Sequence, residues 1–431
     1  MSAPPPHPSP AATDATPRGR RVVRTTVALL FAAWLIDYTD RLVINLVLPD
    51  LGEEFDLSRG QQGLVVSAFF LAYALCQIPG GMLADRFGAR RVTLWALLAW
   101  SLFTALTGFA WSFAALLLLR FAFGAAEGVF PPASLKVLVE RTAPAERAGA
   151  NGVVMSSNAI AGILTPLVAV PLLAAFGWRS VFFSTAALGV FVVVAIRLWL
   201  PDPVPSADPE PEHSERPPRV REVLRHGVLW RFAAMMFGYS TIIWGLNTWI
   251  PTYLEDERGL PVTSLGPVLA LPALAAAAAT VIGGRLSDRF EGHHRKVIVP
   301  GMAVVAVTLP LAAWSSSFTG FVVFGTLAVF SASLSYMPIL SVPMRALPPA
   351  YVGVGSAVVI FGGQVAGMVA PPVMGVIADA FSFETAFAFL VLGAVVAAAM
   401  ALLTPQDTDS FRAALGAASP TRPSVESEQQ S

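Results

Sequence analysis

The stretch that decides the fold is Gly81–Arg91, which reads GMLADRFGARR. Its first six residues recur in altered form in the second half of the chain, as GRLSDR at Gly284–Arg289. Each copy follows a long apolar segment and begins a short charged connection. The repeat therefore divides the chain into two halves of similar organisation.

The composition around these repeats is that of an integral membrane protein. Of the 431 residues, 55% are hydrophobic and 13% are charged, and the mean hydropathy is +0.65. Soluble domains average about 25% charged residues. Basic and acidic residues number 28 each, so no net charge attracts nucleic acid, and the single cysteine, Cys76, excludes a disulfide framework. An ordinary cytosolic enzyme is excluded as well.

Twelve segments are apolar and long enough to cross a bilayer, which takes about 20 residues. A span must satisfy its own backbone hydrogen bonds, so each is expected to be a helix. The expected spans are 25–49, 61–83, 92–110, 112–137, 149–175, 179–200, 229–254, 263–285, 297–314, 318–342, 351–377 and 384–404. The predicted fold class is an all-α membrane protein with twelve transmembrane helices in two six-helix bundles related by pseudo-twofold symmetry.

Five regions follow from this division. The first residues lack the apolar core of a signal peptide, and the Pro- and charge-rich middle segment cannot span a membrane. The expected regions are an N-terminal tail (1–23), a six-helix bundle (24–200), a linker (201–228), a second bundle (229–404) and a C-terminal tail (405–431).

The distribution of arginine predicts the orientation. Arg90 and Arg147 lie in one set of alternate loops, whereas Glu53 and Glu257 lie in the other. The positive-inside rule then places both termini and the linker in the cytoplasm. Arginine far outnumbers lysine, which indicates a GC-rich bacterial genome and hence an inner-membrane, multi-pass protein.

The repeated stretch resembles the cytoplasmic loop signature of the major facilitator superfamily. The matching residues are Gly81, Asp85, Arg86, Gly88, Arg90 and Arg91, and the second copy keeps Asp288 and Arg289. The second copy lacks the later glycine and the paired arginines. The resemblance implies the major facilitator fold, with these charges latching the two halves together on the cytoplasmic side. The alternative interpretation is a charged loop that merely follows the positive-inside rule.

Five charged residues fall well inside the predicted spans: Asp37, Asp40 and Arg41 in the first, and Arg120 and Glu127 in the fourth. Each is costly in hydrocarbon and should face the protein interior or a water-filled cavity. The first three share a helix face at i, i+3 and i+4. A rise of about 1.5 Å per residue puts Arg120 level with Asp40 and Arg41. We expect a cluster of ion pairs, with Asp40 opposite Arg120 as either a static brace or a switch.

The charges of this cluster suit the proton-coupled binding of an anion. Three carboxylates exceed two arginines, so at least one carboxylate has no permanent partner and is stabilised by binding a proton. An arginine stays charged and can hold a carboxylate through two hydrogen bonds. A carboxylate substrate bound there would free the arginine's former partner to take a proton, which couples the two events.

The chain also resembles the anion:cation symporter family, whose bacterial members import sugar acids and other organic anions with protons. The resemblance rests on Asp37-Tyr38-Thr39-Asp40-Arg41, Tyr73, Arg120 to Gly128, Arg147 to Gly152 and Asn247 to Leu254. It implies that Arg41 holds the substrate carboxylate with help from Tyr38 and Tyr73.

The same resemblance implies two proton sites. Glu127 would bind a proton close to the substrate, and Asp40 would bind a second one while paired with Arg120. Asp37 replaces an asparagine that is common in the family, and it could bind a further proton.

Amides would complete the substrate site by the same resemblance. Asn158 in the fifth span and Gln364 in the eleventh would contact the substrate, where sugar-acid carriers often have glutamine and asparagine. Beyond Arg231 at its start, the seventh span contains no basic residue, whereas some relatives have arginine within it, so a monocarboxylate is favoured.

Other polar residues allow two interpretations. Asn247, Ser331, Ser335 and Tyr336 could hydrogen-bond substrate hydroxyls or hold helices together. The sequence contains no phosphate-binding Gly-x-x-x-x-Gly-Lys-Ser loop, and its histidines lie outside the spans. No cofactor, ATP or metal is therefore expected.

Energetics favour symport over uniport. Moving one negative charge inward against an inside-negative potential costs about 2.3 kcal/mol per 100 mV, which one proton cancels. We predict a secondary active transporter, not an enzyme, that imports an organic monocarboxylate with protons by alternating access. Its partners would be the organic anion, protons and the lipid bilayer, with no nucleic acid, and it would act as a monomer.

Two alternatives stay open. One is a drug:proton antiporter of the same fold, although Gly162–Pro166 lacks the glycine pair that follows in many such exporters. The other is a transporter-like sensor with no net transport, for which the linker is short.

Overall fold

The computed structural model describes residues 17–203, 224–347, 349–406 and 411, and its regular structure over these residues is helical. Most of the predicted tails and linker (1–16, 204–223 and 412–431) lies outside the described residues. The first group of helices is α1 (Pro17–Leu46), α2 (Leu48–Phe55), α3 (Arg59–Phe87), α4 (Ala89–Thr107), α5 (Phe113–Gly128), α6 (Phe130–Val139), α7 (Pro144–Met155), α8 (Ser157–Phe176) and α9 (Trp178–Trp199). The second group is α11 (Gly227–Asp256), α12 (Val262–Arg289), α13 (Arg295–Ala313), α14 (Phe318–Ser333), α15 (Tyr336–Ala346), α16 (Pro349–Ala380), α17 (Phe383–Phe389) and α18 (Val391–Leu403).

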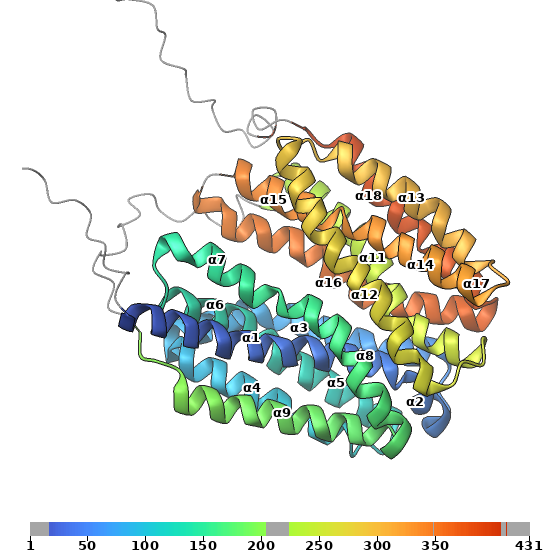
Figure 1. Ribbon diagram of the computed structural model, residues 1–431, viewed down its shortest axis with the longest axis horizontal. Helices are drawn as coiled ribbons and strands as arrows, with labels where there is room; N and C mark the ends of the chain where they lie inside the picture. The colour runs from blue at the N-terminus through green and yellow to red at the C-terminus, as the bar shows by residue number, and fades with distance from the viewer. Residues whose placement is uncertain (1–16, 204–223, 348, 407–410, 412–431) are drawn as a thin grey trace, which may run out of the picture.

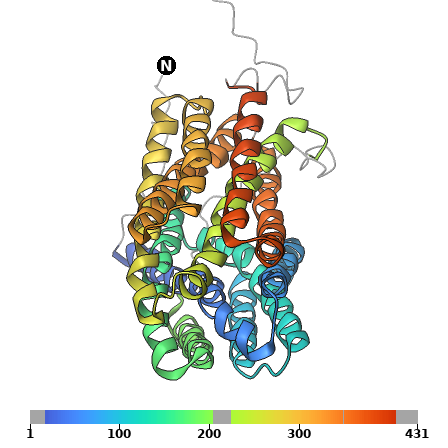
Figure 2. The ribbon, with the colours of Figure 1, turned by 90° about the vertical axis from the view of Figure 1, so that its right-hand side faces the viewer.

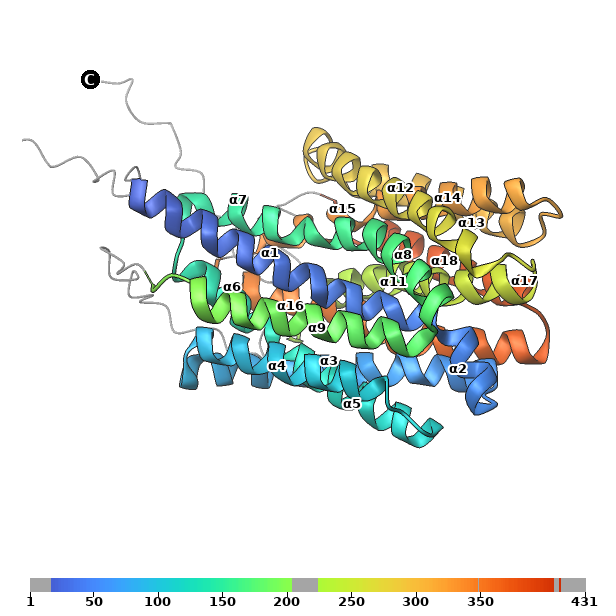
Figure 3. The same cartoon turned by 60° about the horizontal axis from the view of Figure 1, so that its bottom comes forward.

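These groups form two bundles that lie one against the other (Figures 1 and 2). We call α1–α9 the N-terminal bundle and α11–α18 the C-terminal bundle. Figure 3 shows the long helices of the N-terminal bundle running roughly parallel or antiparallel, with α1 and α9 adjacent. The chain thus passes back and forth along the length of each bundle before it enters the next.

Local sequence explains where several helices begin and end. Ser58 and Gln61 form a capping box at the start of α3, with the Ser58 hydroxyl accepting from Gln61 N at 3.2 Å. Gly88 ends α3 and Gly177 ends α8, with φ angles of +86° and +74°. Such left-handed backbone favours glycine, so both turns are encoded directly in the sequence.

Nine helical segments among the described residues are long and apolar enough to cross a membrane. Four of them are helix pairs that continue one another: α5–α6, α7–α8, α14–α15 and α17–α18. The other long helices, α1, α4 and α11, carry polar or charged residues such as Asp40, Arg91 and Asn247. The all-helical expectation is confirmed, while the count of twelve spans stays a prediction.

The outer surface suits a bilayer. Large apolar side chains such as Leu118 on α5, Phe191 on α9 and Val307 on α13 are exposed. Exposed tryptophans lie towards both ends of the bundles, with Trp111 and Trp314 at one end and Trp199 at the other. Tryptophan is enriched at both membrane–water interfaces, so this pattern is typical of a membrane-spanning protein.

The bundles meet at one end and diverge towards the other (Figure 1). We call the end that contains Arg59, Glu257 and Asp379 the closed end, and the end that contains Phe87–Ala89 and Arg289–Arg295 the open end. A Cβ on Gly63 of α3 would lie 2.5 Å from Pro372 of α16, and one on Gly266 of α12 would lie 3.0 Å from Pro166 of α8. Both helix pairs therefore approach backbone to backbone on the closed side.

Candidate functional site

Arg41 is the centre of a buried charged cluster. Its Nη2 lies 2.8 Å from Asp37 Oδ2, one helical turn earlier on α1. Its Nε donates to Glu127 Oε1 on α5 at 3.3 Å. Arg41 is 8% exposed and both carboxylates are fully buried. One guanidinium is thus shared by two carboxylates, which leaves this group with a formal charge of −1 when all three are ionised.

Aromatic rings hold the guanidinium from the other sides. Its central carbon lies 4.4 Å from the ring centre of Tyr73, 5.3 Å from that of Tyr38 and 5.6 Å from that of Phe69. Such cation–π contacts are strongest where the cation is desolvated, as here. Phe69 was not expected from the sequence, although it lies one turn before Tyr73 on α3.

Two glycines bring α5 close enough to α3 to build this arrangement. A Cβ on Gly124 would lie 2.4 Å from the Phe69 carbonyl oxygen, and one on Gly128 would lie 2.5 Å from that of Tyr73. Only glycine permits this approach. Glu127 therefore lies beside the two aromatic residues that cover Arg41.

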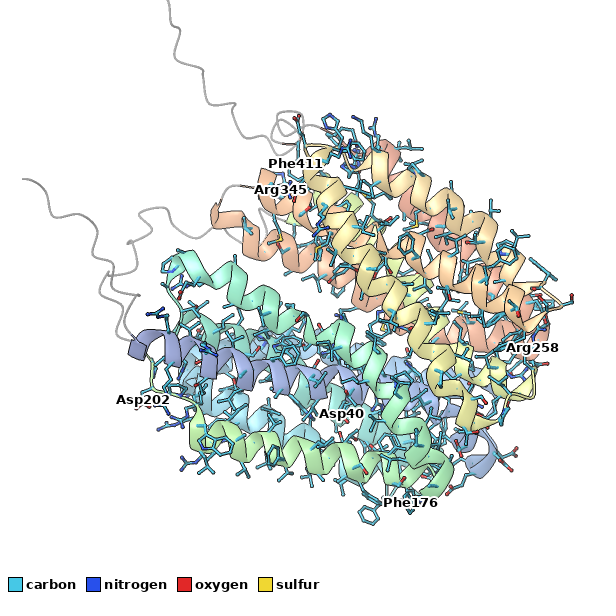
Figure 4. All side chains as sticks on the ribbon, in the orientation of Figure 1. Asp40, Phe176, Asp202, Arg258, Arg345 and Phe411 are labelled. Atoms are coloured by element: carbon cyan, nitrogen blue, oxygen red, sulfur yellow. The ribbon has the colours of Figure 1, made fainter. Side chains whose placement is uncertain are left out.

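The structure describes both Asp40 and Arg120, and the ion pair expected between them is absent from this conformation. No nitrogen of Arg120 lies within 4.0 Å of an Asp40 oxygen, and Arg120 instead packs over Phe123 at 4.5 Å. Asp40 lies beside Trp100 of α4 and Thr185 of α9. Asp40 therefore faces α4 and α9. Figure 4 shows it inside the N-terminal bundle, midway along α1.

The C-terminal bundle faces this cluster with a pair of tyrosines. The rings of Tyr239 on α11 and Tyr336 on α15 lie 5.4 Å apart, and Ser333 lies beside Tyr239. Tyr336 is close enough to Tyr38 to interact with it electrostatically. Tyr239 was not expected, because a single tyrosine in an apolar helix gives no sign of its partner on α15.

Ser335, by contrast, does not face the cluster. It is fully buried, and its hydroxyl lies 3.5 Å from where a Cβ on Gly301 of α13 would be. Of the two interpretations of Ser335, contact between helices is the one that this position fits.

The three predicted amides come from both bundles. Asn158 on α8 is exposed and lies two turns before Thr165, whose hydroxyl donates to Thr39 Oγ1 at 3.2 Å. Asn247 on α11 is exposed, one turn after Trp244. Gln364 on α16 is half-buried, and its Oε1 is buried without a hydrogen-bond partner.

The repeated loop motif forms ion pairs inside each bundle at the open end. Asp85 forms an ion pair with Lys136 Nζ at 2.6 Å, and Asp288 forms an ion pair with Arg345. Arg90 lies 3.5 Å from Asp202, while Arg86, Arg91 and Arg289 make no ion pair within the described residues, and Gly81 lies on α3 just before the motif charges. Figure 4 shows Asp202 and Arg345 at the open ends of different bundles. The expected latch between the halves is therefore not engaged in this conformation.

A different set of contacts joins the bundles at the closed end. Both oxygens of Asp379, near the end of α16, accept from the first backbone N–H groups of α3, from Arg59 at 3.1 Å and Gly60 at 2.9 Å. The Arg59 side chain donates to Glu257 at 3.0 Å and lies 4.3 Å from the ring of Phe383. The start of α3 is thus fixed to the C-terminal bundle.

Carboxylates from both bundles also face one another here. Burial, and then the neighbouring charges of Asp50, Asp256 and Glu53, raise the pKa of Glu255 to about 7. The mutual repulsion is weaker when Glu255 is protonated. The closed end is therefore expected to be more stable at pH values below about 7 than above.

Fold and site together define a class: a multi-pass helical membrane protein with two bundles and a buried ionic site in the first of them. The family model described as Major Facilitator Superfamily matches residues 29–293 and 263–426. The chain belongs to this superfamily of membrane transporters, and it is a transporter rather than an enzyme.

Curated relatives are carriers of organic anions. A probable sulfoacetate transporter of Cupriavidus necator is 30% identical, over 79% of this chain and 84% of its own length. The hexuronate transporter of Bacillus subtilis is 28% identical (88% of this chain, 93% of its own), and a probable galactarate/D-glucarate transporter of Escherichia coli is 29% identical (86% and 91%).

A solved structure shares the fold. The crystal structure of a bacterial homologue of the human lysosomal transporter Spinster, described as inward-facing and unoccupied, superposes with a TM-score of 0.83. It is 20% identical and covers 94% of this chain and all of its own. The expectations of a major facilitator fold and of similarity to sugar-acid carriers are confirmed by these comparisons.

Proposed function

We propose that this protein imports an organic carboxylate, accompanied by protons, by alternating access, as a monomer in the inner membrane of a bacterium. The observation that carries the proposal is the Arg41 cluster, in which one guanidinium is shared by two buried carboxylates. The relatives named as hexuronate, galactarate/D-glucarate and sulfoacetate carriers support an organic anion as substrate.

Competition for Arg41 provides the coupling. A substrate carboxylate can replace Asp37 or Glu127 at the guanidinium only when the displaced group is neutralised, because an unpaired buried charge is costly. Protonation of Glu127 therefore precedes or accompanies binding. Asp37 and Asp40 are the further proton sites in this proposal, and Arg120 supplies a positive charge that can pair with Asp40 in another conformation.

The substrate would lie between the bundles. Its carboxylate would contact Arg41, Tyr38 and Tyr73, and its hydroxyl groups would contact Tyr239, Tyr336 and the amides Asn158, Asn247 and Gln364. Only one guanidinium is present among these groups. The proposal therefore favours a hydroxylated monocarboxylate, such as a hexuronate, over a dicarboxylate or sulfoacetate.

The conformation described here fits the inward-facing step of the cycle. The closed end would face the periplasm, and the open end, with the termini and the linker, would face the cytoplasm. The motif charges of Asp85, Arg86, Arg90 and Asp288 would then join the halves only when the open end closes. In this arrangement α1, α4 and α11 are the three further spans that complete the count of twelve.

The test is transport into proteoliposomes under an imposed pH gradient, with labelled D-glucuronate, D-glucarate, D-galactonate and sulfoacetate as probes. The wild type is expected to accumulate a hydroxylated monocarboxylate when the outside is acidic. Glu127→Gln is expected to lose this accumulation while it still exchanges substrate across the membrane at equal pH, because its amide cannot release a proton.

Glu54→Gln is the matched control. Glu54 is an exposed glutamate whose pKa is lowered by Arg179 and Trp178 of the same bundle, far from Arg41. It should leave accumulation unchanged. Gradient-driven accumulation in Glu127→Gln, or accumulation by the wild type without any gradient, would refute the proposal. Drug export has no support among the relatives named above.

A further inference from the structure

Asp40 lies in a different environment from the Arg41 cluster. It is 2% exposed and borders Trp100 on α4, which is fully buried, and Thr185 on α9. Neither Asp40 oxygen has a hydrogen-bond partner of good geometry, and neither does the Trp100 indole nitrogen. The Asp40 carboxylate, an acceptor, and the Trp100 indole N–H, a donor, thus lie side by side without a hydrogen bond. A buried unbonded carboxylate is costly when ionised, so the ionised form requires a donor.

The surroundings of Asp40 leave few candidates for that donor. The Thr185 hydroxyl already donates to the Val181 carbonyl at 3.0 Å. Arg120 on α5 is the facing cation, but its guanidinium is held over Phe123. The other charged groups that act on Asp40 are Asp37 and Glu127, which are carboxyls. The indole N–H of Trp100 is the neutral donor that remains uncommitted.

Trp100 is held in place by a cluster of aromatic side chains. Its ring meets Phe130 edge-on at 5.0 Å, and Phe130 packs against Trp34 at 5.2 Å. The Trp34 indole differs in one respect, because its N–H donates to Ser134 Oγ at 3.2 Å. One cluster therefore contains two buried indoles: the N–H of Trp34 makes a hydrogen bond, and the N–H of Trp100 makes none.

We propose that Trp100 is the positioning residue for the proton on Asp40. Its indole N–H donates to the Asp40 carboxylate after the proton leaves and is unbonded while the carboxyl carries the proton. This rests on the proposed function only in taking Asp40 as a proton site. A hydrogen bond to an ionised acceptor is about twice as strong as a neutral one, so the donor lowers the proton affinity of Asp40 and eases release.

The proposal can be tested without a transport substrate. Protein in lipid nanodiscs is titrated with pH while infrared spectroscopy follows the carbonyl band of protonated carboxyl groups. The band of Asp40 is identified by its loss in Asp40→Asn. In Trp100→Phe the midpoint of that band should move to higher pH by about one unit, because the ionised form has lost its donor. In Trp34→Phe it should stay within a few tenths of the wild-type value.

A second replacement guards against loss of fold. Substituting benzothiophene for the Trp100 indole keeps the ring shape and removes only the N–H, and it should produce the same upward shift. An unchanged midpoint in both Trp100 replacements, an equal shift in Trp34→Phe, or the absence of any Asp40 band would overturn the proposal. If the Trp100 replacements shift the midpoint as expected but the wild type shows no proton-coupled transport, only the proposed function is contradicted.

Discussion

In the proposed mechanism, Asp37 and Glu127 compete with the incoming anion for the guanidinium of Arg41. They approach different nitrogens of that group, at 2.8 Å and 3.3 Å, so that both must be considered when a carboxylate binds. Each carboxylate that has to be neutralised adds one proton to the binding reaction. Substrate affinity is therefore expected to fall as pH rises, by about tenfold per pH unit for each such proton.

Replacing Asp37 tests this competition. In Asp37→Asn the group formed by residue 37, Arg41 and Glu127 loses one negative charge, and Glu127 is the remaining ionic partner of Arg41. The slope of log KM against pH should decrease by about one, and the KM above neutral pH should fall. The measurement is counterflow of labelled substrate in proteoliposomes at a series of equal internal and external pH values.

Asp56→Asn is the control for Asp37→Asn, since Asp56 is exposed at the end of α2. It should reproduce the wild-type slope. A wild-type slope in an active Asp37→Asn protein would mean that Asp37 keeps its charge throughout and only positions Arg41.

The sequence predicted that Asp37, Arg41 and Glu127 lie close together. The i, i+4 spacing brings Asp37 to Arg41, and the depth of Glu127 along its span brings it to the same level. The sequence could not predict the direction of Asp40. A residue at i+3 lies at the edge of the helix face, and the packing of α4 and α9 decides which side it joins. Neither Trp100 nor Thr185 carries a local signal of that packing.

At the scale of elements, α3 depends on α16 for part of its N-terminal cap. Ser58 and Gln61 satisfy some of the first N–H groups of α3, and Asp379 satisfies those of Arg59 and Gly60. The Asp379 part of this cap requires the two bundles to be in contact at the closed end. Breaking the contact therefore exposes helix donors and costs free energy in addition to the lost ion pairs.

Removing Asp379 should favour opening of the closed end. Loss of a capping side chain costs about 0.5–2 kcal/mol, so Asp379→Ala should raise the population of molecules with the closed end open by about twofold to thirtyfold. The measurement is the distance between spin labels on Asp56→Cys and Ser316→Cys, in a Cys76→Ser background that removes the single native cysteine. A longer distance should gain population.

Glu54→Gln serves as the control for Asp379→Ala, because the partners of Glu54, Arg179 and Trp178, lie in its own bundle. Its distance distribution should match the parent. Gly375→Ala gives an independent check, since its Cβ would lie 2.3 Å from the Arg59 carbonyl oxygen. If neither Asp379→Ala nor Gly375→Ala changed the distribution, these contacts would not hold the closed end together.

The capping box at Ser58 follows from its sequence spacing, but the contribution of Asp379 does not. Asp379 lies 320 positions from Arg59 along the chain, and a lone aspartate near the end of a helix gives no sign of which N-terminus it reaches. Contacts between elements of different bundles depend on the tertiary arrangement and on the conformational state.

At the scale of the whole molecule, the asymmetry between the two ends predicts where reagents can enter. Asn158 is exposed on α8, one turn before Gly162, where a Cβ would lie 3.4 Å from Ala273 of the other bundle. If the open end faces the cytoplasm, a cysteine there is reached from that side. Asn158→Cys, again with Cys76→Ser, should react several-fold faster with a membrane-impermeant maleimide in inverted vesicles than in right-side-out ones.

Ser316→Cys is the opposite control, because Ser316 is exposed at the closed end. It should react faster in right-side-out vesicles. Equal labelling of Asn158→Cys from both sides, or faster labelling from the periplasmic side, would contradict the proposed orientation or the inward-facing assignment, and the Ser316 result would show which.

The repeat in the sequence correctly indicated two similar halves, and the structure adds the partners of its aspartates. Lys136 on α6 pairs with Asp85 and Arg345 on α15 pairs with Asp288, so each copy of the motif has a basic partner on a later helix of its own bundle. In the proposed cycle, the expected latch across the halves would form only in a different conformation.

The glycine contacts between α3 and α5 have a consequence for the order of events in a transport cycle. With the Phe69 and Tyr73 carbonyls packed against Gly124 and Gly128, the aromatic residues of α3 and Glu127 of α5 are held in a fixed relation to one another. If the bundles rock as proposed, this part of the site would keep its geometry. Tyr239 and Tyr336 of the other bundle would then move away from it, and their departure would precede substrate release.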